Sequence, residues 1–336
     1  MSSELQVRQR IVCHTLDGPG GLRLESTPPR QPLAADEVCV CLGAAGVNFP
    51  DLLMTRGAYQ FRPELPFVPG MEGAGRIVEI GPEVSGLTVG QRVMVSARMG
   101  TFATEILVPA AALLPAPDAF SMAEAACFRA ASHTARHALL DRGALERGET
   151  VLVLGAAGGI GLAAVEIAGL LGARVIAAAS SDEKLAVAAT RGAAHLVNYV
   201  RAPLVEQVRA LAPDGVDVIL DPVGGELFEQ ALRLPAWNGR FLVVGFASGC
   251  IGKAPANRVL IRGFSLIGVR AGEAVRRDPH VGERSAGQLA AWAAAGHLRP
   301  HLHATLPLSR AGDALRLLES RQAIGRIALV VDESVR

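Results

Sequence analysis

The chain has 336 residues and a formal net charge of +1, and its composition is 50% hydrophobic and 19% charged. This length favours two domains with packed cores, and the scattered basic residues provide no electrostatic footprint for nucleic acid or a membrane surface. Since no apolar run reaches the ~18 residues that span a bilayer, and no secretory signal is visible at the start, we expect a cytoplasmic protein.

The first part of the chain, to about residue 125, is rich in Pro, Gly and short β-like runs. Turn signals such as Pro69-Gly70 separate runs such as 37–47 and 73–81, which is typical of a strand-rich domain. Cys39 and Cys41 share one face of the first run. We interpret them as small buried hydrophobes, because no second pair stands at zinc-site spacing and five cysteines do not indicate a disulfide framework.

The character of the sequence changes after Pro115-Ala116-Pro117, where a helix-forming run opens with a Ser121/Glu124 capping box. Strands and helices then alternate, and the apolar runs that predict strands lie at 150–155, 173–179, 194–199, 216–221, 240–245 and 264–269. Six strands with helical crossovers between the early ones predict a doubly wound parallel sheet. We expect the closing strand, 325–331, to pair back into the first domain.

The strongest local signal is a Gly-rich turn, Ala156-x-Gly158-x-x-Gly161, which follows a predicted strand and opens a predicted helix. Gly158 lets backbone N–H groups approach a pyrophosphate, Gly161 permits tight helix–strand packing, and the helix N-terminus adds partial positive charge. The residues predicted to bind a dinucleotide here are Ala157, Gly158, Gly159, Ile160 and Gly161. Because Ala156 replaces the first glycine of the full motif, the alternative is a glycine-assisted turn that binds nothing.

The end of the second predicted strand favours NADPH over NAD. An NAD site has an acidic residue there, whereas this chain has Ser180-Ser181, with Lys184 just beyond. Without a carboxylate there is no repulsion of a 2′-phosphate, and the two hydroxyls plus the Lys184 ammonium would bind it. We interpret Asp182 and Glu183 as a solvent-facing first helical turn. The alternative is that Lys184 is a solvated helix residue with no such role.

Five segments carry a resemblance to a known family: 46–81, 156–168, 195–199, 221–225 and 317–331. With their VNF-x-D and PG-x-E patterns, they resemble the zinc-independent quinone oxidoreductase branch of the medium-chain dehydrogenase/reductase superfamily. The resemblance implies an α/β protein, with a Rossmann doubly wound parallel sheet and a GroES-like, mostly β domain. We therefore predict a substrate domain at 1–128, completed by 275–336, and an NADPH-binding Rossmann domain at 129–274.

The same resemblance implies residues for the 2′-phosphate of NADPH. Lys184 and Tyr199 match a lysine and a tyrosine that hold this phosphate in similar enzymes. Arg321 is the positional match for an arginine that can join them, and Arg326 is a weaker match.

The resemblance also implies residues for the acceptor and the nicotinamide. Asn48 and Tyr59 match residues that line the acceptor site, and we expect Asn48 to contact the cofactor as well. Thr134 matches a threonine near the nicotinamide, and Phe246 and Ser248 lie in a loop that resembles the segment passing it.

Zinc is not expected at this site. Zinc-dependent relatives place Cys near the position of Gly46–Asn48 and His in a G-H-E motif, where this chain has Met71. Without Cys or His there is no tetrahedral ligand set. The remaining histidines do not provide one, because they lack the H-E-x-x-H pattern or lie in an expected loop; these are His133, His137, His301 and His303.

Loss of zinc removes the Lewis acid that assists alcohol oxidation, and this favours acceptors that are already electrophilic. We predict hydride transfer from NADPH to a quinone or an α,β-unsaturated carbonyl, with Asn48 or Tyr59 contacting the developing oxyanion and Tyr59 or water providing the proton. One alternative acceptor is an enoyl thioester such as an acyl-CoA, and another possibility is an NADPH-binding module without catalysis.

Two further features lie near the sixth predicted strand. Arg270 stands where relatives often have an aromatic residue, and it either favours an anionic substrate or faces solvent at a dimer edge. By analogy we also expect a homodimer, since 264–269 is an apolar strand at a sheet edge.

Overall fold

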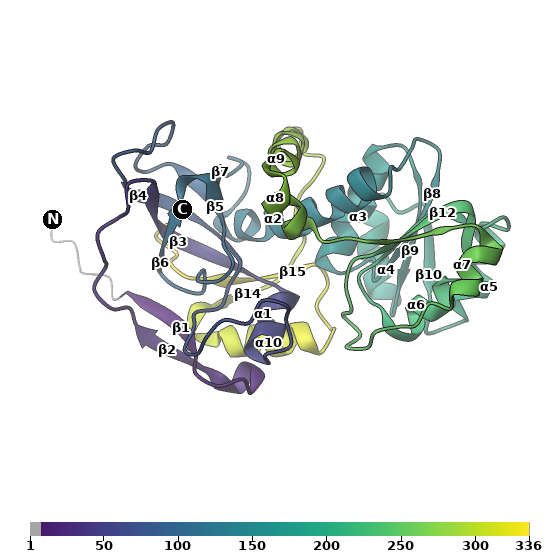
Figure 1. Ribbon diagram of the computed structural model, residues 1–336, viewed down its shortest axis with the longest axis horizontal. Coiled ribbons are helices and arrows are strands. Elements are labelled where there is room, and N and C mark those ends of the chain that lie inside the picture. The colour runs from purple at the N-terminus through teal and green to yellow at the C-terminus, as the bar shows by residue number, and fades with distance from the viewer. Residues whose placement is uncertain (1–7, 336) are drawn as a thin grey trace. The chain divides into compact units, whose positions relative to one another are not determined.

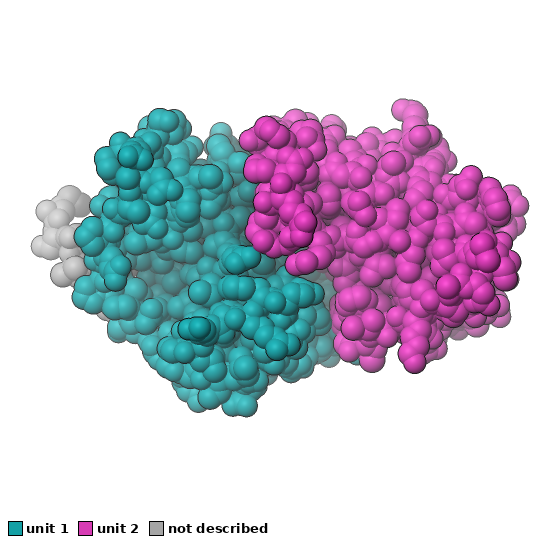
Figure 2. Space-filling model, viewed as in Figure 1, with its two compact units in different colours: residues 1–130, 302–336 teal, residues 131–301 magenta. Residues whose placement is uncertain are grey.

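The computed structural model describes residues 8–335 of the chain. The described residues form two compact units, unit 1 within residues 1–130 and 302–336 and unit 2 from residues 131–301 (Figure 2). Among the described residues, no helix is long and apolar enough to cross a membrane.

Unit 1 is built on a mostly antiparallel sheet in the strand order β14-β15-β3-β4-β5-β7, with β6 also pairing to β3 (Figure 1). Its strands are β3 (Glu37–Val47), β4 (Glu72–Ile80), β5 (Arg92–Ser96), β6 (Glu105–Pro109), β7 (Leu113–Pro115), β14 (Leu302–Pro307) and β15 (Arg326–Val330), and a separate pair is β1 (Gln9–Cys13) and β2 (Leu22–Ser26). The closing strand β15 pairs with β3, which confirms the expected return of the chain to the first domain.

Strand β3 determines where the candidate site of unit 1 lies. Its first half pairs with β6, its second half pairs with β15, and β4 runs along its other edge. Nearly all its side chains are buried. In the β3–β4 register, Gly46 lies opposite Glu72. The end of β3 and the start of β4 therefore bring Asn48 and Glu72 close together, although the two residues are 24 positions apart in the sequence.

Unit 1 also contains helices and short helical turns. They are α1 (Phe49–Thr55), α10 (Ala311–Glu319), the first part of α2 (Met122–Arg136), and the short 3-10 turns η1 (Gly18–Gly21), η2 (Ala110–Ala112) and η4 (Leu308–Arg310). Leu52 of α1 and Leu315 of α10 share a core cluster with Phe102 and Ile327. This packing holds α1 at the end of β3 by burial of apolar surface.

Unit 2 is a six-stranded parallel sheet in the order β10-β9-β8-β11-β12-β13, which confirms the predicted doubly wound architecture. Its strands are β8 (Thr150–Leu154), β9 (Arg174–Ala179), β10 (His195–Asn198), β11 (Val216–Asp221), β12 (Pro235–Val243) and β13 (Ser265–Gly268). Its helices are the second part of α2, the π-helical turn η3 (His137–Arg142), α3 (Gly159–Leu170), α4 (Asp182–Thr190), α5 (Leu204–Leu211), α6 (Gly225–Ala231), α7 (Ala256–Arg262), α8 (Ala271–Arg277) and α9 (Pro279–Ala294).

The boundary between the units differs from the predicted one in the segment 275–301, which the prediction assigned to the first domain and the structure places in unit 2. Side chains of α9 explain this placement. Ser285 Oγ lies 2.7 Å from His133 Nδ1, and Arg136 Nε donates to Gln288 Oε1 at 2.9 Å. Both partners belong to α2, and composition alone does not reveal which domain an amphipathic helix packs against.

Candidate functional site

The Gly-rich turn of unit 2 has the backbone of a phosphate cradle. Gly155 takes a left-handed conformation with φ +58°, and α3 begins immediately after Gly158. A Cβ at Gly161 would collide with the Gly155 carbonyl oxygen and lie 2.8 Å from Ala156 Cα, so only glycine allows this helix to pack so closely. At Gly158 the nearest atom to such a Cβ is 3.4 Å away, which leaves room beside the helix N-terminus for an anion.

Ser180 and Lys184, both predicted to bind the 2′-phosphate, lie together at the carboxyl end of β9. Lys184 Nζ donates to Ser180 Oγ at 3.0 Å. Ser181 has a different contact, because its hydroxyl accepts from the Lys184 backbone N–H at 3.3 Å and caps α4. Tyr199 follows β10, and its backbone N–H donates to the Ala179 carbonyl at 3.3 Å. These residues therefore meet at one edge of the sheet.

Asp182 is not simply the solvated residue that the sequence suggested. Its carboxylate accepts from Asn198 Nδ2 at 2.8 Å and pairs with Arg201. This pairing neutralises a negative charge close to Lys184, and so it lowers the repulsion that a phosphate would meet there.

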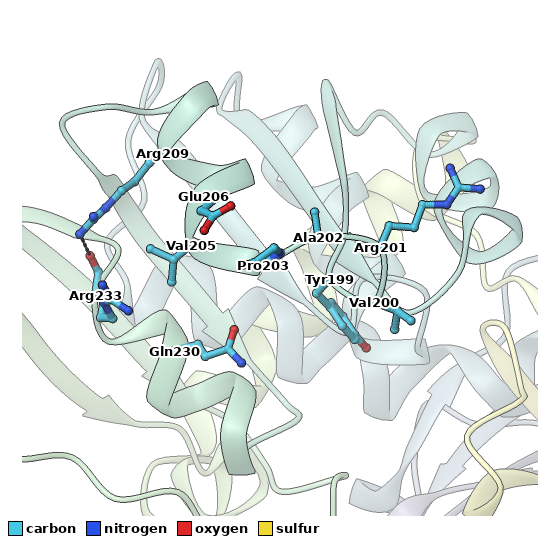
Figure 3. A pocket seen from close by; sticks show the side chains of 10 residues that line it. All are labelled: Tyr199, Val200, Arg201, Ala202, Pro203, Val205, Glu206, Arg209, Gln230 and Arg233. Atoms are coloured by element: carbon cyan, nitrogen blue, oxygen red, sulfur yellow. Dashed lines mark hydrogen bonds between the residues drawn. The ribbon is translucent and has the colours of Figure 1, made fainter.

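Tyr199 also forms part of the wall of a surface pocket of about 650 Å³ beside helices α5 and α6 (Figure 3). Arg209 and Arg233 lie at its far side, where an Arg209 guanidinium nitrogen is 3.5 Å from the Arg233 carbonyl oxygen. The tyrosine is half-buried. Since it borders open space instead of being sealed in the core, its side chain can be reached by a ligand.

The loop proposed to pass the nicotinamide is held by the Asp-Pro-Val-Gly-Gly turn after β11. The Ser248 N–H donates to the Val223 carbonyl at 2.8 Å, and a Cβ at Gly224 would lie 2.8 Å from the Phe246 ring. Asp221 shapes this turn, because its Oδ1 accepts from the Val223 N–H at 2.7 Å and from the Gly224 N–H at 2.9 Å. Burial raises the pKa of the Asp221 carboxyl to about 6.

Asp221 was not predicted as a site residue, although it begins the segment 221–225 that carries part of the family resemblance. The available signal was its position at the end of a predicted central strand, directly before a Pro and two glycines. Thr134 lies half-buried on α2, and its predicted contact with the nicotinamide remains a prediction.

Unit 1 contains a buried polar cluster around Asn48, the residue between β3 and α1. The Asn48 backbone N–H donates to Asp51 Oδ2 at 2.8 Å, and the Gly70 N–H donates to Asp51 Oδ1 at 3.1 Å. Asp51 is fully buried, and this burial raises the pKa of its carboxyl to about 7. Asp51 therefore joins the start of α1 to the segment that leads into β4.

Glu72 is the centre of this cluster. Its Oε1 accepts from Asn48 Nδ2 at 3.0 Å and from Arg326, and its Oε2 accepts from the Ala130 N–H at 2.9 Å. The Glu72 and Arg326 side chains are 2% and 10% exposed. Arg326 was a weaker match for the 2′-phosphate, and that prediction is wrong, because its guanidinium is committed to a buried carboxylate of unit 1.

Tyr59 and Met71 lie together on a hydrophobic cluster formed by Cys13, Met54 and Phe67. Tyr59 is half-buried, which suits either a packing role or the predicted role in the acceptor site. Met71 stands where zinc-dependent relatives have histidine.

The donor set around Met71 does not fit zinc. The Met71 thioether is packed on apolar side chains, and the Asn48 amide donates an N–H group to Glu72. The Glu72 carboxylate is already paired with Arg326. Within residues 8–335, no three His, Cys, Asp or Glu side chains converge in a way that could hold a metal ion.

Three other residues considered in the sequence analysis are Arg321, Arg270 and His303. Arg321 follows the end of α10 with φ +58° and is exposed, and its role at the phosphate remains a prediction. The Arg270 side chain is 65% exposed and lies 3.6 Å from Glu273. His303 lies within strand β14 and not in the expected loop, because residues 302–307 pair with β15.

Comparison with known proteins gives matches to two family descriptions. Residues 34–118 match the alcohol dehydrogenase GroES-like domain, and residues 159–282 match the zinc-binding dehydrogenase family. Among curated relatives, the bovine (Bos taurus) quinone oxidoreductase-like protein 2 is 38% identical over 320 residues, which cover 95% of this chain and 91% of the relative.

Solved structures agree with these matches. The quinone oxidoreductase from Thermus thermophilus, solved alone and with NADPH, is 34% identical with a TM-score of 0.83, and the alignment covers 96% of this chain and 100% of that one. The Escherichia coli quinone oxidoreductase in complex with NADPH is 26% identical with a TM-score of 0.88, and the same shares of both chains are covered.

Proposed function

The chain belongs to the quinone oxidoreductase-like branch of the medium-chain dehydrogenase/reductase superfamily, and from this premise we propose that it is an NADPH-dependent reductase of quinones or α,β-unsaturated carbonyls. The observation that carries the proposal is the contact between Lys184 Nζ and Ser180 Oγ at the end of β9. An ammonium and a hydroxyl stand there in place of the carboxylate that would bind an unphosphorylated ribose.

The residues of unit 2 fit the phosphate groups of NADPH. Gly158 and Gly161 provide room and a helix N-terminus for the pyrophosphate, and Lys184 provides a positive charge for the 2′-phosphate. When bound, NADPH supplies the hydride. The chain itself holds and orients the cofactor, and the relatives solved with NADPH support this assignment.

The acceptor class follows from the ligand chemistry of unit 1. Because Met71, Asn48 and Glu72 do not form a zinc site, the chain provides no Lewis acid of that kind to polarise a carbonyl. Acceptors that are electrophilic on their own, such as quinones and enones, need only orientation and a polar contact. Tyr59 is half-buried at the surface of unit 1 and is our candidate for that contact.

Steady-state assays test this proposal directly. Consumption of NADPH is measured with a quinone, an alkenal and an enoyl-CoA, and each assay is repeated with NADH. We expect turnover with a quinone or an alkenal and a preference for NADPH. Turnover with enoyl-CoA alone would move the acceptor to the thioester class, and tight NADPH binding without any turnover would identify a non-catalytic binding module.

We further propose a homodimer that forms along the edge strand β13. This strand pairs only with β12 among the described strands, and apolar side chains around it are exposed: Trp237 at 73%, Leu260 at 80%, Ile261 at 73% and Leu266 at 40%. An unpaired edge with an apolar border favours pairing with an identical edge. Sedimentation of the wild type and of Leu260→Glu checks this. A monomeric wild type would contradict it.

A further inference from the structure

The turn at residues 222–225, which follows the central strand β11, lies against the Gly-rich turn of unit 2. A Cβ at Gly155, the residue directly before Ala156, would lie 2.7 Å from Val223 Cγ2. The Val223 side chain therefore occupies the space beside this glycine. Because β8 and β11 are neighbours in the parallel sheet, their carboxyl ends bring the two turns together.

The same turn also holds the loop 246–250, which is proposed to pass the nicotinamide. The Ala247 N–H donates to the Pro222 carbonyl at 3.0 Å. The Ser248 N–H donates to the Val223 carbonyl at 2.8 Å. One short turn thus contacts both the segment proposed to hold the pyrophosphate and the segment proposed to pass the nicotinamide.

Asp221 is the side chain that fixes this turn. Its Oδ1 accepts from the N–H groups of Val223 and Gly224, at 2.7 and 2.9 Å, which is the arrangement of an Asx turn. Gly224 and Gly225 both take left-handed conformations, with φ +72° and +61°. Two consecutive left-handed residues turn the chain sharply, and the bonds to Asp221 stabilise that shape.

Among the described residues, the Asp221 side chain makes no other hydrogen bond. The residue is 0% exposed, and within residues 8–335 its second oxygen, Oδ2, has no partner. Burial of a carboxyl group costs free energy unless hydrogen bonds offset it. Since both bonds that Asp221 makes go to the turn, the structure gives this buried group the role of holding the turn.

We propose that Asp221 is a positioning residue for the cofactor, because it fixes the turn that holds loop 246–250 in place beside the Gly-rich turn. This inference rests on the proposed function, since both segments are expected to bind NADPH. Asp221 acts through the backbone of the turn, as its own side chain is fully buried. Its effect should therefore be the same for NADPH and NADH, which differ only in the 2′-phosphate.

Equilibrium binding to Asp221→Ala tests this role, because the variant removes both hydrogen bonds. We expect the Kd of NADPH and that of NADH to rise about tenfold, the loss of roughly one hydrogen bond to a charged group. The Kd of adenosine 2′-phosphate, which has no pyrophosphate and no nicotinamide, should stay the same. Calorimetric titration at pH 8 keeps the carboxylate ionised, since its pKa is about 6.

Two further variants separate positioning from general destabilisation. Asp221→Asn keeps an oxygen that accepts the same two N–H groups, and we expect it to retain most of the affinity for both dinucleotides. Asp214→Ala is the matched control, because Asp214 is exposed just before the same strand, and it should bind like the wild type.

Three results would overturn the inference. The first is an Asp221→Ala variant, folded by its thermal transition, that binds NADPH as tightly as the wild type. The second is an equal loss of affinity for adenosine 2′-phosphate, and the third is an Asp221→Asn variant as weak as Asp221→Ala. Each would show that the bonds to the turn do not position the cofactor.

A second measurement uses the wild type alone and needs no variant to fold. Without ligand, the N–H groups of Ala247 and Ser248 should exchange with deuterium as slowly as those of Val223 and Gly224, because the turn and the loop open together. Rapid exchange at either pair would overturn the inference. Slow exchange at both pairs in a protein that binds NADPH without any turnover would support the inference and contradict only the proposed function.

Discussion

The Gly-rich turn of unit 2 and the buried cluster of unit 1 are two polar features built in opposite ways. The turn uses backbone groups of adjacent residues, and Gly158 within it is exposed. The cluster uses charged side chains that are far apart in the chain, since Glu72 and Arg326 are separated by 254 positions. A backbone site depends on space and conformation, whereas a buried charged site depends on every partner being present.

The largest effect that would sharpen this contrast is expected from Arg326→Met. The variant leaves the Glu72 carboxylate buried without its cation, and breaking a buried pair in this way typically costs about 3–5 kcal/mol. We expect the urea unfolding midpoint to fall strongly. Arg316→Met is the control, because Arg316 is exposed in its ion pair with Asp313, and it should change stability by less than ~1 kcal/mol. Equal losses of stability in the two variants would contradict the view that the buried cluster depends on its ion pair.

The next largest effect is expected on NADPH binding, from a substitution of Lys184 in unit 2. Lys184→Ala removes the ammonium that lies beside Ser180. A hydrogen bond to a charged group contributes roughly 1.5–3 kcal/mol, so the Kd for NADPH should rise about 10- to 100-fold while that for NADH changes little. Fluorescence titration with both cofactors measures this. Glu183→Ala, an exposed neighbour, is the control, and equal loss for NADPH and NADH would reject the role of Lys184.

Two glycines of the same turn should respond differently to one added methyl group. In Gly161→Ala the new Cβ meets the backbone of Gly155 and Ala156, and overpacking of this kind costs about 1–3 kcal/mol. In Gly158→Ala the Cβ meets nothing closer than 3.4 Å, so the fold should tolerate it. Thermal denaturation compares the pair. If Gly158→Ala were the more destabilising variant, our account of the turn would be wrong.

The last effect is a pH dependence of the cluster. Burial raises the pKa of Asp51 to about 7 from its ordinary value of 3.8. The folded state therefore binds this proton more tightly than the unfolded state, and the resulting stability is fully present below pH 4 and is lost as pH rises through 7.

Asp51→Asn cannot titrate and provides the test. The difference in unfolding free energy between wild type and Asp51→Asn should fall between pH 5 and pH 7, by at most ~1.4 kcal/mol per pH unit. Urea unfolding at several pH values measures it. A constant difference across this window would show that Asp51 does not titrate there.

The same contrast explains which parts of the site could be predicted. The Gly-rich turn, Ser180, Lys184 and Tyr199 lie at the ends of predicted strands β8, β9 and β10, and neighbouring parallel strands bring their carboxyl ends together. Arg326 could not be placed in this way. Its position near the end of the chain suggested a phosphate partner, whereas the β15–β3–β4 pairing places it beside Glu72.

The sequence by itself determined the doubly wound sheet, the turn that favours a dinucleotide, and a ligand set unsuited to zinc. These features depend on periodicity, on glycines at fixed spacing and on residue identity, all of which are local. Tertiary structure alone decided that α9 packs in unit 2, that Arg326 neutralises Glu72, and that both N–H groups of Asn48 are already in use. Each of these three features depends on which residues distant in the sequence come into contact, and these contacts are determined by strand register and packing.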